Sequence, residues 1–174
     1  EESRADFVFS FTPAGASSVT LEILSGKPLQ SLYKNVVNGS DLADAALRAA
    51  DLAVAKTSGL RGIFAGKLVF VGQRGGATEL YMGGLLFDNV TQLTRDNAQC
   101  VRPSLSPDGS TILYTSYYRN GFPDIYSIDV ASGRREVFLS FNGVNTGATF
   151  SPDGRTVAMI LSGTGNAELY TINS

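Results

Sequence analysis

One tetrapeptide, Ser-Pro-Asp-Gly, occurs twice in this chain, beginning at Ser106 and at Ser151, and the two copies are 45 residues apart. Each copy is followed by an apolar run, a glycine-bearing turn and a second short run that contains a tyrosine, Tyr126 or Tyr170. Tyr81 lies 45 residues before Tyr126 in a similar run, so the period extends upstream of the first tetrapeptide. A period of about 45 residues with four short strands per unit is typical of the blades of a β-propeller.

The residues from Gly66 onward form short runs of β-forming residues that are separated by Gly, Asn, Asp and Pro. The spacing places the middle of a first blade at 67–84, a complete second blade at 100–140, and a third blade at 148–173 that lacks one strand. The fold class that we predict is therefore an α+β N-terminal piece followed by an all-β part. The all-β part is a partial propeller of about three four-stranded blades.

The repeated tetrapeptide is explained by the chemistry of turns. Pro107 presets φ at the second position of the turn, and Asp108 suits the third position. Gly109 supplies the residue with positive φ that lets the next strand leave the turn. Because a turn accounts for the aspartates, we interpret Asp108 and Asp153 as turn residues rather than as catalytic groups or metal ligands. The tyrosines at the strand ends are expected to pack between blades.

The first part of the chain, residues 1–60, has a different texture. Three alternating apolar and polar runs, at 6–13, 17–24 and 29–37, predict an antiparallel meander. An alanine-rich segment with helical spacing follows, with Ser40 as the expected N-cap and Gly59 as the stop. We therefore predict two domains, with residues 1–60 as the C-terminal part of a small α/β domain and residues 61–174 as propeller blades.

Two scarcities exclude whole classes of chemistry. The chain has no His and one Cys, Cys100, so its residues supply no Ser-His-Asp or Cys-His pair and no Cys/His zinc site. Cys100 is expected to be a small buried residue. The net charge of −2 argues against a nucleic-acid partner, and no apolar run reaches membrane-spanning length. These features exclude those catalytic pairs and zinc sites, and we expect no cofactor and no metal.

The ordered set of motifs resembles the TolB family of the Tol–Pal system. The resemblance rests on the meander at 9–36, the helix, the junction "SGLRGIF" at 58–64 and the two blades that carry "SPDG". It implies a periplasmic scaffold in bacteria that is not an enzyme. Such a scaffold binds proteins, supports outer-membrane integrity and takes part in envelope constriction at cell division. The implied partners are a Pal-type peptidoglycan-associated lipoprotein and other Tol proteins.

The resemblance also implies where a partner docks. In the family, Pal binds at the propeller mouth, near the loops that lead into the innermost strand of each blade. The matching loops here are 97–102 and 142–147, and the predicted contact residues are Gln99, Arg102, Val144, Asn145 and Thr146. The alternative interpretation is that these are ordinary turns at the start of a strand. Phe122, in the loop "RNGFPD", either touches a partner or caps its blade.

Two further interpretations stay open at this point. The blades are compatible with the propeller of a prolyl-oligopeptidase-type serine peptidase, although the chain has no Gly-x-Ser-x-Gly motif and no His. They are also compatible with a generic ligand-binding propeller. Because members of the TolB family are two to three times longer, the chain is either a fragment or a short relative. A short chain could complete its ring as a homodimer through exposed blade edges.

Overall fold

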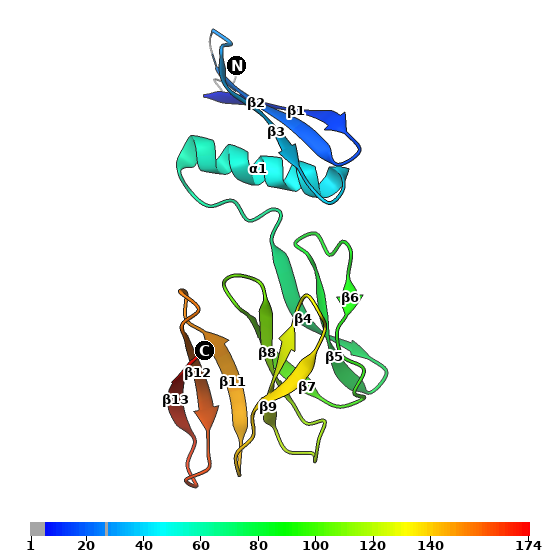
Figure 1. Cartoon of the computed structure of the whole chain (residues 1–174), viewed down its shortest axis with the longest axis vertical. Helices are drawn as coiled ribbons and strands as arrows, with labels where there is room; N and C mark the ends of the chain where they lie inside the picture. The colour runs from blue at the N-terminus through cyan, green and yellow to red at the C-terminus, as the bar shows by residue number, and fades with distance from the viewer. Residues whose placement is uncertain (1–5, 27) are drawn as a thin grey trace, which may run out of the picture. The chain divides into compact units, whose positions relative to one another are not determined.

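The computed structural model describes residues 6–26 and 28–174, which form two compact units that divide between Gly66 and Lys67 (Figure 1). The first unit holds three strands and one helix, and the second holds ten strands. This confirms the predicted fold class, an α+β piece followed by an all-β part. Within the described residues, no helix is long and apolar enough to cross a membrane.

The first unit is a three-stranded antiparallel meander with a helix on one face (Figure 1). Its elements are β1 (Phe7–Gly15), β2 (Ser18–Ser25), β3 (Ser31–Asn38) and α1 (Leu42–Ser58). The central strand β2 alternates between buried and partly exposed residues, and its buried side chains Val19, Leu21 and Ile23 pack on the helix. The helix presents Ala45, Ala49 and Ala53, whose small side chains allow the helix to approach the sheet closely.

The helix begins one residue later than the sequence predicts. Asp41, not Ser40, is the N-cap, because its carboxylate accepts a hydrogen bond of 2.8 Å from the Asp44 backbone N–H. The Asp44 carboxylate reaches back and accepts a bond of 2.8 Å from the Ser40 N–H. The carboxylates of Asp41 and Asp44 thus accept hydrogen bonds from two backbone N–H groups at the start of the helix. The predicted stop at Gly59 is confirmed, with φ of 71° and an N–H that donates to Ala55 O.

The segment after the helix is attached to the helix by one carboxylate. Asp51 accepts hydrogen bonds from the backbone N–H groups of Phe64, at 2.6 Å, and of Ala65, at 3.0 Å. Gly62 lies directly against this residue, since a Cβ atom at Gly62 would come within 2.3 Å of Asp51 Cα. Asp51 therefore fixes the path of residues 62–65, which contain the end of the "SGLRGIF" motif.

The second unit consists of three antiparallel sheets in chain order (Figure 1). The first contains β4 (Lys67–Arg74), β5 (Ala77–Gly84) and β6 (Thr91–Gln92); the second contains β7 (Cys100–Leu105), β8 (Thr111–Ser116), β9 (Asp124–Asp129) and β10 (Arg135–Leu139); the third contains β11 (Asn145–Phe150), β12 (Thr156–Leu161) and β13 (Glu168–Asn173). Only the middle sheet has four strands among the described residues. The arrangement is a partial propeller.

The middle sheet is covered on both faces. Tyr114 and Tyr126 stack on each other, with ring centroids 5.6 Å apart, and face the first sheet, where Leu80 is fully buried. Leu113 and Ile125, the alternate residues, face the third sheet. The expected packing of tyrosines between blades therefore holds for Tyr126, which is 4% exposed. Tyr170 is 36% exposed because no further sheet covers β13 in the described part of the chain.

The two Ser-Pro-Asp-Gly turns have the predicted geometry. Gly109 and Gly154 have φ of 76° and 72°. The Asp108 carboxylate accepts bonds from Ser106 Oγ, at 2.6 Å, and from the Ser110 N–H, at 3.0 Å. In the second turn Asp153 accepts the equivalent bonds from Ser151 Oγ and from the Arg155 N–H. Because these bonds stabilise the ionised form, the pKa of Asp108 is lowered to about 2 and that of Asp153 is also lowered.

The first prediction concerns Asp51. Replacing it with Ala removes the acceptor for two backbone N–H groups, which should cost about 1.5 kcal/mol locally. Hydrogen exchange of the Phe64 and Ala65 amides should then accelerate roughly tenfold, while the amides of β2 stay protected. Asp51→Asn, which keeps one acceptor oxygen, should give an intermediate rate. Unchanged exchange in Asp51→Ala would show that the carboxylate does not hold this segment.

The second prediction concerns acid stability. The pKa of Asp108 is about 2 in the folded chain, against 3.8 for an aspartate without these hydrogen bonds, so its ionised form stabilises the fold. This stabilisation is present above about pH 4 and is lost as the pH falls through about 2. Asp108→Asn should therefore flatten the loss of stability between pH 4 and pH 2. Unfolding by urea along that pH series measures it, and a slope as steep as that of the wild type would contradict the assignment.

Candidate partner-binding site

The antiparallel connections divide the loops of the second unit between two ends of the sheets. The Ser-Pro-Asp-Gly turns, at 106–110 and 151–155, lie at one end. The loops at 117–123 and 140–144 lie at the other, together with the segment 95–99 that leads into β7. We call the second end the mouth end. All five residues predicted to contact a partner lie at or near the mouth end.

Arg102 occupies a strained position in β7. Its φ is 53°, in the left-handed region that residues with a Cβ rarely adopt. The pairing of β7 with β8 shifts register between Val101 and Ser104, so Arg102 lies in a β-bulge. The equivalent residue 45 positions later is Gly147, with φ of 70° and the same shift of register. The fold therefore demands a left-handed residue at this point of each inner strand, and in β7 that residue is an arginine.

The side chain of Arg102 lies over the next inner strand. A Cβ atom added to Gly147 would come within 3.2 Å of Arg102 Nη1 and 3.9 Å of its Cδ. β7 and β11 are neighbours in space, and hydroxyl pairs also link the second and third sheets: Ser104 with Thr149 at 3.3 Å and Thr115 with Thr146 at 3.1 Å. The structure thus places Arg102 against Gly147, the residue that follows the predicted contact residue Thr146. Arg102 is exposed and Thr146 is half-buried.

Asn145 is the most constrained of the predicted residues. It is 1% exposed, and its Nδ2 donates to Phe141 O at 2.8 Å and to Pro123 O at 3.2 Å. Its Oδ1 accepts from the Phe141 N–H at 3.1 Å. The side-chain amide of Asn145 is therefore engaged in hydrogen bonds that connect the loops 117–123 and 140–144 to the start of β11. This geometry suits a residue that positions the loops rather than one that touches a partner.

Cys100 occupies the position that corresponds to Asn145 in the preceding inner strand. Its N–H donates to Thr78 Oγ1 at 2.9 Å and its Sγ lies 3.0 Å from Thr78 O. Thr78 and Pro123, the residues contacted in the two cases, are also 45 positions apart. The prediction that Cys100 is buried is confirmed, at 2% exposure, and burial raises the pKa of its thiol to about 11.

Gln99 and Val144 present exposed side chains from well-fixed backbone. The Gln99 carbonyl accepts from the Tyr117 N–H at 3.0 Å, and the Val144 N–H donates to Ser162 Oγ at 2.8 Å. Within the segment 95–99, the buried Glu79 accepts from the Asn97 N–H at 2.8 Å. The same segment is also tied to β10 by an ion pair between Asp96 and Arg135.

Two large apolar side chains at the mouth end are more exposed than Val144, the apolar member of the predicted set. Phe122 is 65% exposed and Phe141 is 61% exposed, while Val144 is 42% exposed. Sequence reasoning singled out Phe122 but missed Phe141. The signal that could have found Phe141 is an aromatic residue beside Gly and Asn in the segment "SFNGVN", where a turn has no need of it.

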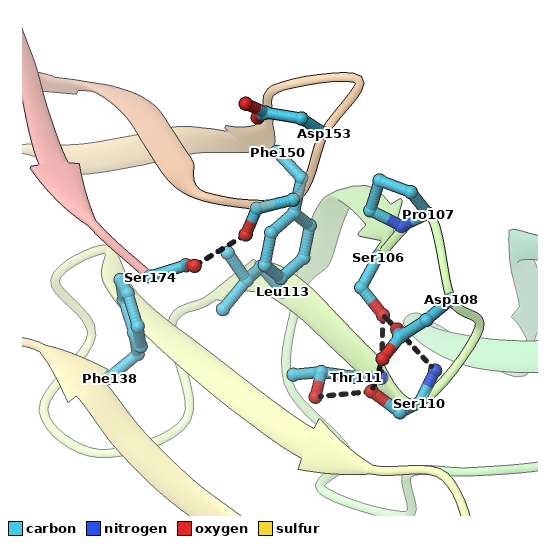
Figure 2. A pocket seen from close by; sticks show the side chains of 11 residues that line it. Ser106, Pro107, Asp108, Ser110, Thr111, Leu113, Phe138, Phe150, Asp153 and Ser174 are labelled. Carbon is cyan, nitrogen blue, oxygen red and sulfur yellow. Dashed lines mark hydrogen bonds between the residues drawn. The ribbon is translucent and has the colours of Figure 1, made fainter.

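The opposite end of the sheets carries a cavity of about 370 Å³ between the two repeated turns (Figure 2). Leu113, Phe138 and Phe150 form its apolar floor, and Asp108 and Asp153 lie at its rim. Figure 2 shows Asp108 turned into its own turn, where it bonds to Ser106 and Ser110. No group of three or more His, Cys, Asp or Glu side chains gathers in the described residues to hold a metal ion.

Comparison with known proteins identifies the family. Residues 54–174 match the family model described as the TolB beta propeller domain. The chain belongs to the TolB β-propeller family. It is 34% identical over 117 residues to a TolB homologue of Chlorobaculum tepidum, which covers 67% of this chain and 26% of that protein. It is also 34% identical over 126 residues to the Tol-Pal system protein TolB of Alcanivorax borkumensis, covering 71% and 29%.

Solved structures support the same fold. TolB from Acinetobacter baumannii superposes with a TM-score of 0.78 at 24% identity, over 96% of this chain and 43% of that one. Dipeptidyl peptidase 4 of Porphyromonas gingivalis gives 0.53 at 16% identity, over 97% and 23%. At these identities the likeness shows the fold alone. The predicted resemblance to TolB is confirmed, and the matched region of this TolB-family chain spans less than a third of the length of those curated relatives.

The third prediction concerns the strain at Arg102. Arg102→Gly should raise the free energy of unfolding by about 1 kcal/mol, because glycine adopts a left-handed conformation without the clash of a Cβ atom. Gly147→Ala should lower it by about 1 kcal/mol or more, since the new Cβ meets both an unfavourable φ and Arg102. Tyrosine fluorescence during urea unfolding reports this, because six of the seven tyrosines lie at or after Tyr81. A less stable Arg102→Gly variant would mean that the contact of the guanidinium with Gly147 outweighs the strain.

Proposed function

We propose that this chain is a non-enzymatic, protein-binding part of a Tol–Pal system, located in the bacterial periplasm. In that role it supports outer-membrane integrity and envelope constriction at cell division. Membership of the TolB propeller family supports this, as does the name of its relatives, Tol-Pal system protein TolB. The proposed partner is a Pal-type peptidoglycan-associated lipoprotein, and other Tol proteins are further candidates.

The observation that carries the proposal is the strained Arg102. A left-handed conformation costs an L-residue about 1–2 kcal/mol, and such strain persists mainly where a site requires it. Gly147 shows that glycine fits the same position of the repeat without this cost. An arginine held there, exposed and without an ion-pair partner among the described residues, is what a binding surface needs.

The five predicted residues receive different roles in this proposal. Gln99, Arg102, Val144 and Thr146 contact the partner, since each side chain is exposed or half-buried at the mouth end. Asn145 positions the loops on either side of β11 and makes no contact of its own. The preformed backbone reduces the ordering cost of binding, because the loops already have their hydrogen bonds in the unbound chain.

The alternative function, the propeller of a serine peptidase, is supported only by similarity of fold. This chain contains no His, so its residues do not supply the base of a Ser-His-Asp triad. Homodimer formation through the exposed edges of the outermost blades is a separate proposal. It is supported by the stacked pair Phe70 and Tyr81, which resembles the buried pair Tyr114 and Tyr126 and is only partly covered, and by Leu169 and Ile172 on β13, which are 74% and 39% exposed.

The fourth prediction tests the proposed function directly. Titration calorimetry of the full chain with the soluble domain of the Pal-type lipoprotein from the same source should show binding. Arg102→Gly, which relieves strain and keeps the backbone, should weaken it about tenfold. Arg134→Gly, which removes an exposed arginine at the opposite end, serves as the control and should bind like the wild type. Absence of binding by the wild-type chain would overturn the proposal.

A further inference from the structure

Phe122, Phe141 and Val144 gather at the mouth end because one buried amide holds their loops together. Asn145 Nδ2 bonds to the carbonyl of Pro123, the residue after Phe122, and to the carbonyl of Phe141 itself. Val144 is its chain neighbour. We call these three residues the apolar triad. They come from two separate loops, and they are 65%, 61% and 42% exposed.

The triad is held rigidly although it is exposed. The Phe122 N–H donates to Asn120 Oδ1 at 3.0 Å, and the Gly121 N–H donates to Tyr117 O at 3.2 Å. Gly121 has φ of 78°, which lets the loop 117–123 turn back sharply. Large apolar side chains that are exposed on fixed backbone favour a docking surface, since a mobile loop would partly shelter them by folding over.

The charge around the triad is positive. Arg119 lies in the same loop as Phe122, Arg102 lies against Gly147 in the strand that Asn145 begins, and Arg95 stands at the start of the segment 95–99. No acidic side chain of residues 6–26 and 28–174 lies within ion-pair distance of these three arginines. Of the acidic residues nearby, Asp96 pairs with Arg135 and Glu168 accepts a hydrogen bond of 2.8 Å from the Tyr170 hydroxyl. Asp124, which follows Pro123, is 3% exposed and its Oδ2 has no hydrogen-bond partner in the described residues, so its carboxylate lies beneath the surface rather than on it.

From this juxtaposition we infer that the mouth end binds an acidic peptide segment that carries at least one aromatic or aliphatic anchor. The anchor packs on the apolar triad and the carboxylates face Arg119 and Arg102. Aromatic residues and arginine are the side chains enriched at protein interfaces, and the net charge of −2 for the whole chain makes this local excess of arginine a feature of the surface. The inference rests on the proposed function, because it describes the chemistry by which the same end recognises its partner.

The fifth prediction tests the triad with two probes. The first is the soluble domain of the Pal-type lipoprotein, measured by calorimetry at about 50 mM and 500 mM salt. The double variant Phe122→Ser with Phe141→Ser should bind about tenfold or more weakly, because it removes the apolar contact. Arg119→Glu should also weaken binding and should reduce its dependence on salt. These side chains are exposed, so the fold should be kept, which tyrosine fluorescence checks.

The control variants lie at the opposite end of the same unit. Leu86→Ser removes an apolar side chain that is 70% exposed in the loop between β5 and β6, and Arg134→Glu reverses a charge in the turn between β9 and β10. Both should bind like the wild type. If the wild type binds the lipoprotein and the triad and Arg119 variants bind equally well, the inference is wrong while the proposed function stands.

The second probe separates the two proposals. A synthetic decapeptide with alternating Glu and Phe should shift the amide NMR signals of 117–123 and 140–146, and the matching Lys-Phe peptide should not. These shifts in a chain that ignores the lipoprotein would keep the inference and overturn the proposed function. Absence of shifts with the acidic peptide, or equal shifts with both peptides, would overturn the inference about charge and anchor.

Discussion

The second unit depends on burying both faces of its middle sheet against the two neighbouring sheets. β8 shows the constraint most clearly, because five of its six residues are buried and its alternate side chains serve two different cores. Ile112 and Tyr114 pack toward the first sheet, whereas Leu113 packs toward the third. Each fully buried side chain of this size contributes about 1.5–3 kcal/mol, so the neighbours on both sides stabilise the middle sheet. A repeated sequence supplies such neighbours, and the two Ser-Pro-Asp-Gly turns, 45 residues apart, mark the repeat.

Apolar faces alone would not fix how one sheet is placed against the next. Hydrogen bonds fix this placement at the start of each inner strand, where Cys100 bonds to Thr78 and Asn145 bonds to Pro123. The two pairs are equivalent in the repeat although their chemistry differs, with a threonine hydroxyl in one and a side-chain amide in the other. Two residues further on, Arg102 and Gly147 form bulges that bend the inner strands at the same point. The contacts and bulges thus lie at equivalent positions in the two blades, although different residue types form them.

This variation in residue type explains what the sequence could and could not predict. The turns at Gly109 and Gly154, the helix stop at Gly59 and the burial of Cys100 follow from local rules and are found as expected. The start of the helix was misjudged because Asp41 and Ser40 are both good caps, and the choice depends on where Asp44 points. The burial of Asn145 could not be predicted, since its partners, Pro123 and Phe141, come together only in the folded sheets. The positive φ of Arg102 is likewise hidden, because arginine carries no signal for it.

The two ends of the sheets differ in how their loops are stabilised. At the end with the repeated turns, Asp108 and Asp153 use their carboxylates within their own loops, so the same four residues recur. At the mouth end the loops obtain their hydrogen bonds from buried side chains beneath them, Glu79 in one case and Asn145 in the other. The exposed side chains of these loops are then not needed to supply those hydrogen bonds. Phe122 and Phe141 have no aromatic counterparts in the repeat, since the positions 45 residues earlier hold Ala77 and Asp96, and side chains that vary on a fixed backbone are the ones that can specify a partner.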